Sequence, residues 1–201
     1  MSQAPKTISS FSSATLHEAF GRRGAIPSAI KPVTHGMRIY GSAFTVLSPP
    51  QDNLMLHKAI YAAKRGDVLV VGVSGFYEAG YWGEVMSVAA MARQLAGLVI
   101  DGCIRDANEI AAMGFPTFAR GTCIRGTSKY GGGALQVPIV LGDVVANPGD
   151  LIVGDDDGVV VIPSGEAEAL ATAAGERIEY EADVMRRLRA GETTLAIFNL
   201  P

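Results

Sequence analysis

The sequence is poor in cysteine and in clustered positive charge, and each shortage excludes a class of protein. Its two cysteines, Cys103 and Cys123, are too few for a disulfide-stapled scaffold and favour a reducing, cytoplasmic setting. Lysine and arginine total 17 against 20 aspartate and glutamate residues, which leaves a net charge of −3. Since no basic block is present either, we expect no nucleic-acid partner.

The sequence also lacks a long unbroken apolar run. The longest apolar stretch, 86–100, is interrupted by polar residues and falls short of the roughly 20 residues that a membrane-spanning helix needs. Residues 1–10 lack the apolar core of a signal peptide, so we expect neither a membrane location nor export. Hydrophobic residues nevertheless make up 48% of the chain, which is enough for a globular core.

Apolar runs alternate with amphipathic segments between residues 37 and 119, which predicts a βαβ arrangement with parallel strands. The expected strands are 37–48, 68–73, 97–100 and 115–119, and the expected helices are 54–64, 84–94 and 106–113. Asp101 and Gly102 are expected to turn the chain after the third strand. A shorter helix is expected after Ser12, a typical capping residue.

The pattern changes after residue 136. Three apolar runs, separated by the turn sequences NPGD and DDDG, predict a small antiparallel or barrel-like sheet. These runs are 137–145, 150–155 and 158–163. A long helix with a charged outer face is expected over about 165–190, followed by an apolar tail. We therefore expect one α/β domain over 1–163 and a C-terminal helical extension over 164–201 that packs on a neighbouring subunit.

The segment AGLVIDGCIRDANE, residues 96–109, combines a buried strand with a charged strand end, where ligands bind in open α/β sheets. Its charged residues are Asp101, Arg105, Asp106 and Glu109. Arg105 offers a rigid fork for a carboxylate or enolate oxygen, and Asp106 and Glu109 suit a hard cation, directly or through water. The same Asp-x-x-Glu pattern is also a helix-capping arrangement, and its spacing leaves both interpretations open.

The segment GYWGEVM, residues 80–86, is a glycine-rich loop that leads into a helix. Backbone N–H groups at such a helix start predict a site for a carboxylate or a phosphate. Glu84 in the first turn either adds a carboxylate to a metal site or complements the helix dipole, and both interpretations remain open.

The stretch GYWGEVMSVAAMARQLAGLVIDGCIRDANEIAAMGFPTFARG resembles the RraA-like family. Within it, the similarity is to the 4-hydroxy-4-methyl-2-oxoglutarate and 4-carboxy-4-hydroxy-2-oxoadipate aldolases, which are class II pyruvate aldolases. It continues through VPIVLGDVVANPGDLIVGDDDGVVVIP and covers roughly residues 40–190. The resemblance implies an α/β fold of the swivelling ββα-type sandwich kind, assembled as a homotrimer or homohexamer with sites between subunits.

The resemblance also implies roles for individual residues. By position, Arg105 binds pyruvate and stabilises its enolate, and Asp106 is the principal ligand of a divalent metal, Mg²⁺ or Mn²⁺. Glu84 and Glu109 position water molecules on that metal. The backbone around Gly83, Val85 and Met86 binds the pyruvate carboxylate. An acidic residue from a neighbouring subunit completes such sites, and the candidates are Glu181, as the best positional match, with Glu176, Glu179 and Asp183.

These residues suit metal-dependent retro-aldol cleavage of a 4-hydroxy-2-oxoacid to pyruvate and a second oxo acid. Loss of CO₂ from oxaloacetate passes through the same pyruvate enolate, so oxaloacetate decarboxylase activity is expected beside it. Two alternatives are a non-catalytic RraA-type regulator that binds a ribonuclease or another protein, and an enzyme of this fold acting on an unrelated acid. The presence of Glu84, Glu109 and the long terminal helix favours the aldolase.

The remaining candidates are expected to be structural or solvent-exposed. His17, His35 and His57 show no ligand spacing. Arg125 and Lys129 could reach a second substrate carboxylate, but the favoured interpretation is that they are solvated surface charges. No lysine lies on an apolar strand that would lower its pKa, which disfavours a Schiff-base mechanism. The five lysines are Lys6, Lys31, Lys58, Lys64 and Lys129.

Overall fold

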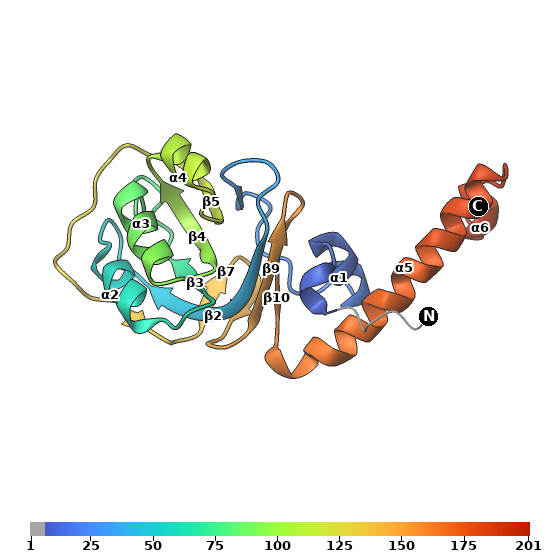
Figure 1. Ribbon diagram of the computed structural model, residues 1–201, viewed down its shortest axis with the longest axis horizontal. Coiled ribbons are helices and arrows are strands. Elements are labelled where there is room, and N and C mark those ends of the chain that lie inside the picture. The colour runs from blue at the N-terminus through green and yellow to red at the C-terminus, as the bar shows by residue number, and fades with distance from the viewer. Residues whose placement is uncertain (1–6) are drawn as a thin grey trace.

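The computed structural model describes residues 7–201, which form an α/β body with a long C-terminal helix extending from it (Figure 1). Lys6 and most of the stretch inspected for an export signal lie outside the described residues. Within 7–201, every helix is too short or too polar to span a bilayer.

Four parallel strands form the centre of the main sheet. They are β2 (Ile39–Leu47), β3 (Asp67–Gly72), β4 (Gly97–Ile104) and β5 (Thr117–Thr122), and they are connected by helices α2 (Leu54–Ala62), α3 (Glu84–Ala92) and α4 (Ala107–Met113). Each strand pairs in parallel with the next one along the chain, in the order β2, β3, β4, β5. The predicted βαβ arrangement is therefore confirmed.

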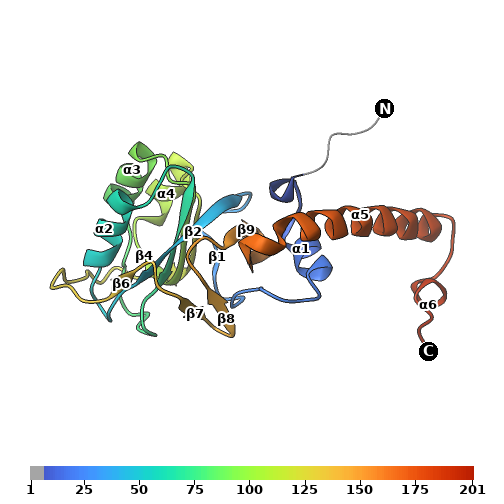
Figure 2. The ribbon, with the colours of Figure 1, turned by 90° about the horizontal axis from the view of Figure 1, so that it is seen from below.

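The sheet is covered on both faces, which explains why β3 is apolar without interruption from Val68 to Val71. On β3, Leu69 and Val71 pack under the three helices, while Val68 and Val70 belong to a second cluster on the opposite face. That second face is covered by the hairpin of β7 (Ile139–Leu141) and β8 (Val144–Ala146) (Figure 2). A continuous apolar run is the usual pattern of a parallel strand buried on both sides.

Antiparallel strands extend the sheet beyond its parallel centre. These strands are β9 (Leu151–Asp155) and β10 (Gly158–Ile162) on the side of β2, with β1 (Lys31–Pro32) on β5 and the short β6 (Ala134–Leu135) on β2. The C-terminal runs are therefore antiparallel, as expected, but β9 and β10 continue the main sheet instead of forming a separate one. The result is a mixed α/β fold with a barrel-like sheet, which confirms the predicted fold class.

Asp101 and Gly102 lie inside β4, so the turn expected there is wrong. The strand continues to Ile104, past an irregularity in its pairing with β5. Gly102 suits this crowded position because a Cβ atom would meet the Val73 side chain at 3.0 Å. The Asp101 carboxylate is buried and pairs with Arg120 on β5, so this ion pair links the two strands.

Within residues 7–201, the first half of the C-terminal helix packs on the α/β body. Helix α1 (Ser13–Ala19), with Ser12 accepting the Thr15 N–H at 3.1 Å, packs with the first half of α5 (Ala167–Arg189) against β9 and β10. Short 3₁₀ turns, Ile8–Ser10 and Ser164–Glu166, precede these two helices. The second half of α5 projects from the body and is followed by α6 (Thr194–Ile197) (Figure 2). This part exposes the apolar side chains Tyr180, Met185, Leu195, Phe198 and Leu200.

Candidate active site

The two segments singled out from the sequence are hydrogen-bonded neighbours. The loop that follows β3 runs beside the end of β4, where the Tyr81 N–H donates to the Cys103 carbonyl at 2.9 Å. In the next hydrogen bond between the two segments, the Arg105 N–H donates to the Trp82 carbonyl at 2.9 Å. Because parallel strands end at the same edge of the sheet, the glycine-rich loop and the Arg-Asp pair share one site.

Asp106 is oriented toward the glycine-rich loop and not toward its own helix. It occupies the N-cap position of α4, yet its side chain makes no capping hydrogen bond there. Its Oδ2 atom instead accepts the Glu84 N–H at 3.1 Å and lies 3.6 Å from the Arg105 Nε atom. The residue has a left-handed backbone, with φ of 55°, which is uncommon outside glycine. The structure therefore disfavours the capping interpretation of Asp106.

Gly83 makes this arrangement possible. A Cβ atom at that position would lie closer than 3.0 Å to the Asp106 Oδ2 atom and 3.3 Å from the Arg105 side chain. Next to it, the fully buried Trp82 donates its indole N–H to the Ser87 Oγ atom at 2.7 Å, and Ser87 donates to the Gly83 carbonyl at 3.1 Å. The loop is thus held at both its backbone and its largest side chain.

The N-terminus of α3 provides unpaired backbone donors beside Arg105. The first hydrogen bond of the helix runs from the Ser87 N–H to the Gly83 carbonyl at 3.1 Å. The N–H groups of Val85 and Met86 consequently have no acceptor within the helix, as at every helix start. Free N–H groups at the positive end of a helix are a binding site for a carboxylate.

A cavity of about 280 Å³ adjoins these groups. Its lining combines the expected Gly83, Val85, Met86, Arg105 and Asp106 with the rest of the glycine-rich loop and with residues outside the two segments. The former are Gly80, Tyr81 and Trp82, and the latter are Asn53, His57, Gly126, Thr127 and Lys129. Asn53 and His57 come from the N-cap and the first turn of α2, and Thr127 and Lys129 come from the loop after β5. No local motif marks these residues. They could have been inferred only from the rule that parallel strands end at the same edge of a sheet, which brings the segments after different strands together.

His57 was expected to be a surface or capping residue, but the structure places it on the cavity wall. Burial lowers the pKa of its imidazole, and the nearby Lys129 charge lowers it further. His57 is therefore neutral at physiological pH, so it offers a hydrogen bond to a ligand without adding charge.

Two further titratable groups beside the site also stay neutral at physiological pH. Burial raises the pKa of the Tyr81 hydroxyl, which donates to the Phe76 carbonyl at 3.0 Å and accepts the Gln51 N–H at 2.8 Å. Burial, followed by the neighbouring Cys123, raises the pKa of the Cys103 thiol. A thiol with a raised pKa is not an activated nucleophile, which disfavours a nucleophilic role for Cys103.

Glu84 and Glu109 are near the pair but outside the cavity. Glu84 contributes its backbone N–H to Asp106, while its side chain is exposed. Glu109 lies along an adjoining shallow depression of about 660 Å³, whose lining shares Arg105 and Asp106 with the cavity. Both glutamates remain candidates for a role through water.

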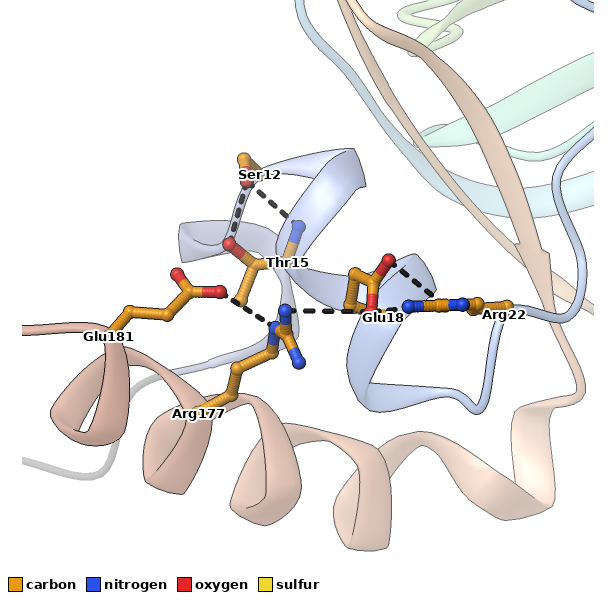
Figure 3. Close-up of polar contacts among 6 residues, drawn as sticks. All are labelled: Ser12, Thr15, Glu18, Arg22, Arg177 and Glu181. Atoms are coloured by element: carbon orange, nitrogen blue, oxygen red, sulfur yellow. Dashed lines mark hydrogen bonds and ion pairs between the residues drawn. The ribbon is translucent and has the colours of Figure 1, made fainter. Parts of the chain in front are cut away.

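Glu181 lies on α5, distant in the sequence from these loops, and is engaged within its own chain. Its Oε1 atom is 2.8 Å from the Arg177 Nε atom (Figure 3). The Arg177 Nη2 atom also lies 3.5 Å from the Oε2 atom of Glu18 on α1. Glu181 is predicted to complete the site of a neighbouring subunit. Contacts within one chain do not test that role, so the role of Glu181 stays a prediction.

A divalent cation fits the donors at Asp106 only if most of its ligands are water. Among residues 7–201, no three histidine, cysteine, aspartate or glutamate side chains converge as in a metal centre built entirely by protein. Mg²⁺ is commonly bound through one or two carboxylates while keeping several waters, and Mn²⁺ accepts the same ligands. One carboxylate beside an open polar cavity meets that requirement.

The fold and the Arg105–Asp106 pair are those expected of an RraA-like protein. The chain matches the family model described as "RraA-like: Aldolase/RraA" over residues 13–161, and it belongs to this family. A protein of Halalkalibacterium halodurans named "Putative 4-hydroxy-4-methyl-2-oxoglutarate aldolase" is 41% identical over 165 residues, which cover 82% of this chain and 77% of that protein.

Solved structures agree with this assignment. An uncharacterised protein of Pseudomonas syringae pv. tomato superposes with a TM-score of 0.81 and 28% identity, covering 96% of this chain and 95% of that one. RraAS2 of Streptomyces coelicolor, described as an unusual member of the RNase ES inhibitor RraA family, gives a TM-score of 0.77 and 30% identity. That match covers 88% of this chain and 92% of RraAS2.

Proposed function

We propose that the protein is a divalent-metal-dependent pyruvate aldolase, which cleaves a 4-hydroxy-2-oxoacid into pyruvate and a second oxo acid. The observation that carries this proposal is the meeting of Arg105, Asp106 and the first turn of α3 around one small cavity. The developing pyruvate enolate is negative, so it requires groups that bind it and stabilise its charge. The Arg105 guanidinium, a metal ion held by the Asp106 carboxylate and the free N–H groups of α3 would supply both. The name of the Halalkalibacterium halodurans relative supports the same chemistry.

Each of these groups has a separate task in the proposed reaction. The N–H groups of Val85 and Met86 hold the pyruvyl carboxylate at the positive end of α3. As the bond between C3 and C4 breaks, the 4-hydroxyl group loses its proton to water and becomes the carbonyl of the second oxo acid. Arg105 donates to the 2-oxygen, which becomes negative, and the enolate then takes up a proton at C3 from water. A divalent cation at Asp106 would polarise the 2-keto group and stabilise the same negative charge. Glu84 and Glu109 would orient water near Asp106.

Oxaloacetate decarboxylation is proposed as a side activity of the same site. When oxaloacetate loses CO₂, the electron pair of the broken bond remains on the pyruvyl C3 and delocalises onto the 2-oxygen. The charge therefore develops where Arg105 already donates, and the enolate then takes up a proton at C3 from water to give pyruvate.

We also propose that a second copy of the chain completes the site, in a homotrimer or homohexamer. The projecting half of α5 carries exposed apolar side chains, including Tyr180 and Met185, which are typical of an interface. Docking on a neighbour would bring Glu181 toward that neighbour's site. The ion pair between Glu181 and Arg177 is partly exposed, and pairs of this kind contribute about 0–1 kcal/mol to stability. Breaking this pair when the subunits dock would therefore cost little.

Pyruvate release from oxaloacetate and from 4-hydroxy-4-methyl-2-oxoglutarate is expected to require Mg²⁺ or Mn²⁺. EDTA should reduce both rates to the background, and added metal should restore them, because one carboxylate holds the cation weakly. A coupled pyruvate assay measures both reactions, with Asp106→Asn as a variant that should need a higher metal concentration. Full activity in EDTA after dialysis would contradict the role given to Asp106.

The alternative function is that of a non-catalytic regulator that binds a protein such as a ribonuclease. It is supported by the description of the Streptomyces coelicolor relative as a member of an RNase inhibitor family. A folded, metal-supplied protein that releases no pyruvate from either substrate would favour this alternative. The presence of Glu84 and Glu109 beside the Arg105–Asp106 pair, together with the long helix α5, favours the enzyme.

A further inference from the structure

The loop after β3 contacts a largely buried ion pair before it reaches the candidate active site. In that pair, the Arg120 Nε atom on β5 meets the Asp101 carboxylate on β4, and the two side chains are 23% and 12% exposed. Both charges lose most of their water there, so stability alone is a weak reason for such a pair. Its contact with the loop indicates a further role.

Arg120 contacts the loop through the ring of Tyr77. The Arg120 Cζ atom lies over that ring, 4.3 Å from its centroid, which is the geometry of a cation–π interaction. Arg120 therefore joins three segments of the chain. They are its own strand β5, the strand β4 through Asp101, and the loop after β3 through Tyr77.

Side chains hold the middle of this loop, because its backbone does not. Within residues 7–201, the backbone of residues 77–79 makes no hydrogen bond, whereas the residues on either side of it are hydrogen-bonded. Glu78 forms an exposed ion pair with Arg125 at 3.8 Å, and pairs of this kind contribute little. The contact of Tyr77 with Arg120 is therefore the main polar restraint on this part of the loop.

The end of the same loop encloses the stem of the Arg105 side chain. A Cβ atom on Gly80 would lie 3.2 Å from the Arg105 Cβ atom, and one on Gly83 would lie 3.3 Å from its Cγ atom. A Cβ atom on Gly80 would also lie closer than 3.0 Å to the Cys123 carbonyl oxygen. Arg105 is half exposed and its ion pair with Asp106 is 3.6 Å long, so these backbone contacts determine where its guanidinium lies.

We propose that Arg120 is a positioning residue for Arg105, although it does not line the cavity. By holding Tyr77, it fixes the loop three residues before Gly80, and the loop in turn fixes the Arg105 side chain. Asp101 keeps the Arg120 guanidinium in place between the two strands. The inference rests on the proposed function, in which Arg105 stabilises the developing enolate.

Removing the Tyr77 ring tests this contact without leaving a buried charge unpaired. Tyr77→Leu is expected to lower kcat for oxaloacetate decarboxylation by about 10-fold, less than the roughly 10²-fold that a displacement of 1 Å can cost. KM should change by less than about threefold, because Arg105 acts on charge that develops in the transition state. Tyr77→Phe keeps an aromatic face for Arg120 and should retain at least about a third of the wild-type kcat.

The same substitution in an Arg105→Ala protein separates positioning from a general structural effect. If the contact acts through Arg105, adding Tyr77→Leu to Arg105→Ala should lower kcat by less than about twofold, because the positioned group is gone. A general structural effect would lower kcat by the same factor in both proteins. Pyruvate release at a raised enzyme concentration measures these rates, and thermal unfolding confirms that each variant is folded.

Substitutions of Arg120 itself and a control in the same loop complete the test. Arg120→Met should lower kcat as Tyr77→Leu does, and Arg120→Lys, which keeps a cation for Asp101 and the ring, should recover part of the loss. If Arg120→Met does not fold, because it leaves the Asp101 carboxylate unpaired, the Tyr77 variants and Arg120→Lys carry the test. Glu78→Gln removes an exposed charge next to Tyr77 and should change neither kcat nor KM.

The possible failures are distinguishable. If wild type releases pyruvate and Tyr77→Leu leaves kcat unchanged, or lowers it equally with and without Arg105, the role of Arg120 is overturned and the aldolase remains. If metal-supplied wild type releases no pyruvate from oxaloacetate or from 4-hydroxy-4-methyl-2-oxoglutarate, the proposed function fails and the inference fails with it.

Discussion

Replacing Arg105 with alanine is expected to lower kcat for pyruvate release by about 10²- to 10³-fold, the usual effect of removing one donor to a developing oxyanion. The loss should be similar for aldol cleavage and for oxaloacetate decarboxylation, because both reactions pass through the same enolate. Stability should change little, since the Arg105 side chain is half exposed and its ion pair with Asp106 is 3.6 Å long. Steady-state kinetics and thermal unfolding measure the two effects.

A matched control separates this role from a general change of charge. Arg125 is another exposed arginine of the same region, and its pair with Glu78 at 3.8 Å lies outside the cavity lining. The variant Arg125→Ala removes the same charge and should retain activity within a few-fold of wild type. Equal losses in the two variants would mean that net charge, and not a specific contact, explains the effect of Arg105.

Gly83→Ala is expected to cost about 10²-fold or more in activity, although it adds only one methyl group. The new Cβ atom would lie closer than 3.0 Å to Asp106 Oδ2, so the carboxylate must move away from Arg105 and the Glu84 N–H. A displacement of about 1 Å is enough to cause a loss of this size at an active site. The same displacement should raise the Mg²⁺ concentration needed for half-maximal activity, which a metal titration of pyruvate release measures.

Gly126→Ala is the appropriate control for Gly83→Ala. Gly126 lines the same cavity, but a Cβ atom there would have no neighbour within 4 Å. We expect this variant to keep its activity and its metal requirement. A Gly83→Ala protein with wild-type activity would show that the position of Asp106 is not critical.

Local patterns in the sequence were sufficient to predict the centre of the fold. The runs that became β2 and β3 are rich in apolar and β-branched residues, and glycines mark the ends of helices such as α4 at Gly114. The half of the site formed by Gly83, Arg105 and Asp106 was also predictable. Its residues belong to two short motifs at the ends of neighbouring strands, as the bridge between Gly80 and Cys103 confirms.

The rest depended on contacts between residues far apart in the sequence. Asp101 looked like a strand-end residue, but Arg120 on the next strand neutralises it inside the sheet, and a local pattern does not show that pairing. Lys129 looked like a surface charge, but a hydrogen bond between Asp52 and Ser128, which are 76 residues apart, holds its loop beside the cavity. The orientation of Asp106 toward α3 likewise depends on the close approach that Gly83 allows.

Exchange of the pyruvate methyl protons with deuterium tests the central claim most directly, because it reports formation of the enolate without any second substrate. In D₂O with Mg²⁺, NMR should show the methyl signal of pyruvate decreasing in the presence of the wild-type protein. Arg105→Ala and EDTA should each abolish that decrease, whereas Arg125→Ala should leave it unchanged. A folded, metal-supplied wild-type protein that leaves the methyl signal constant would contradict an enolate site at Arg105 and Asp106.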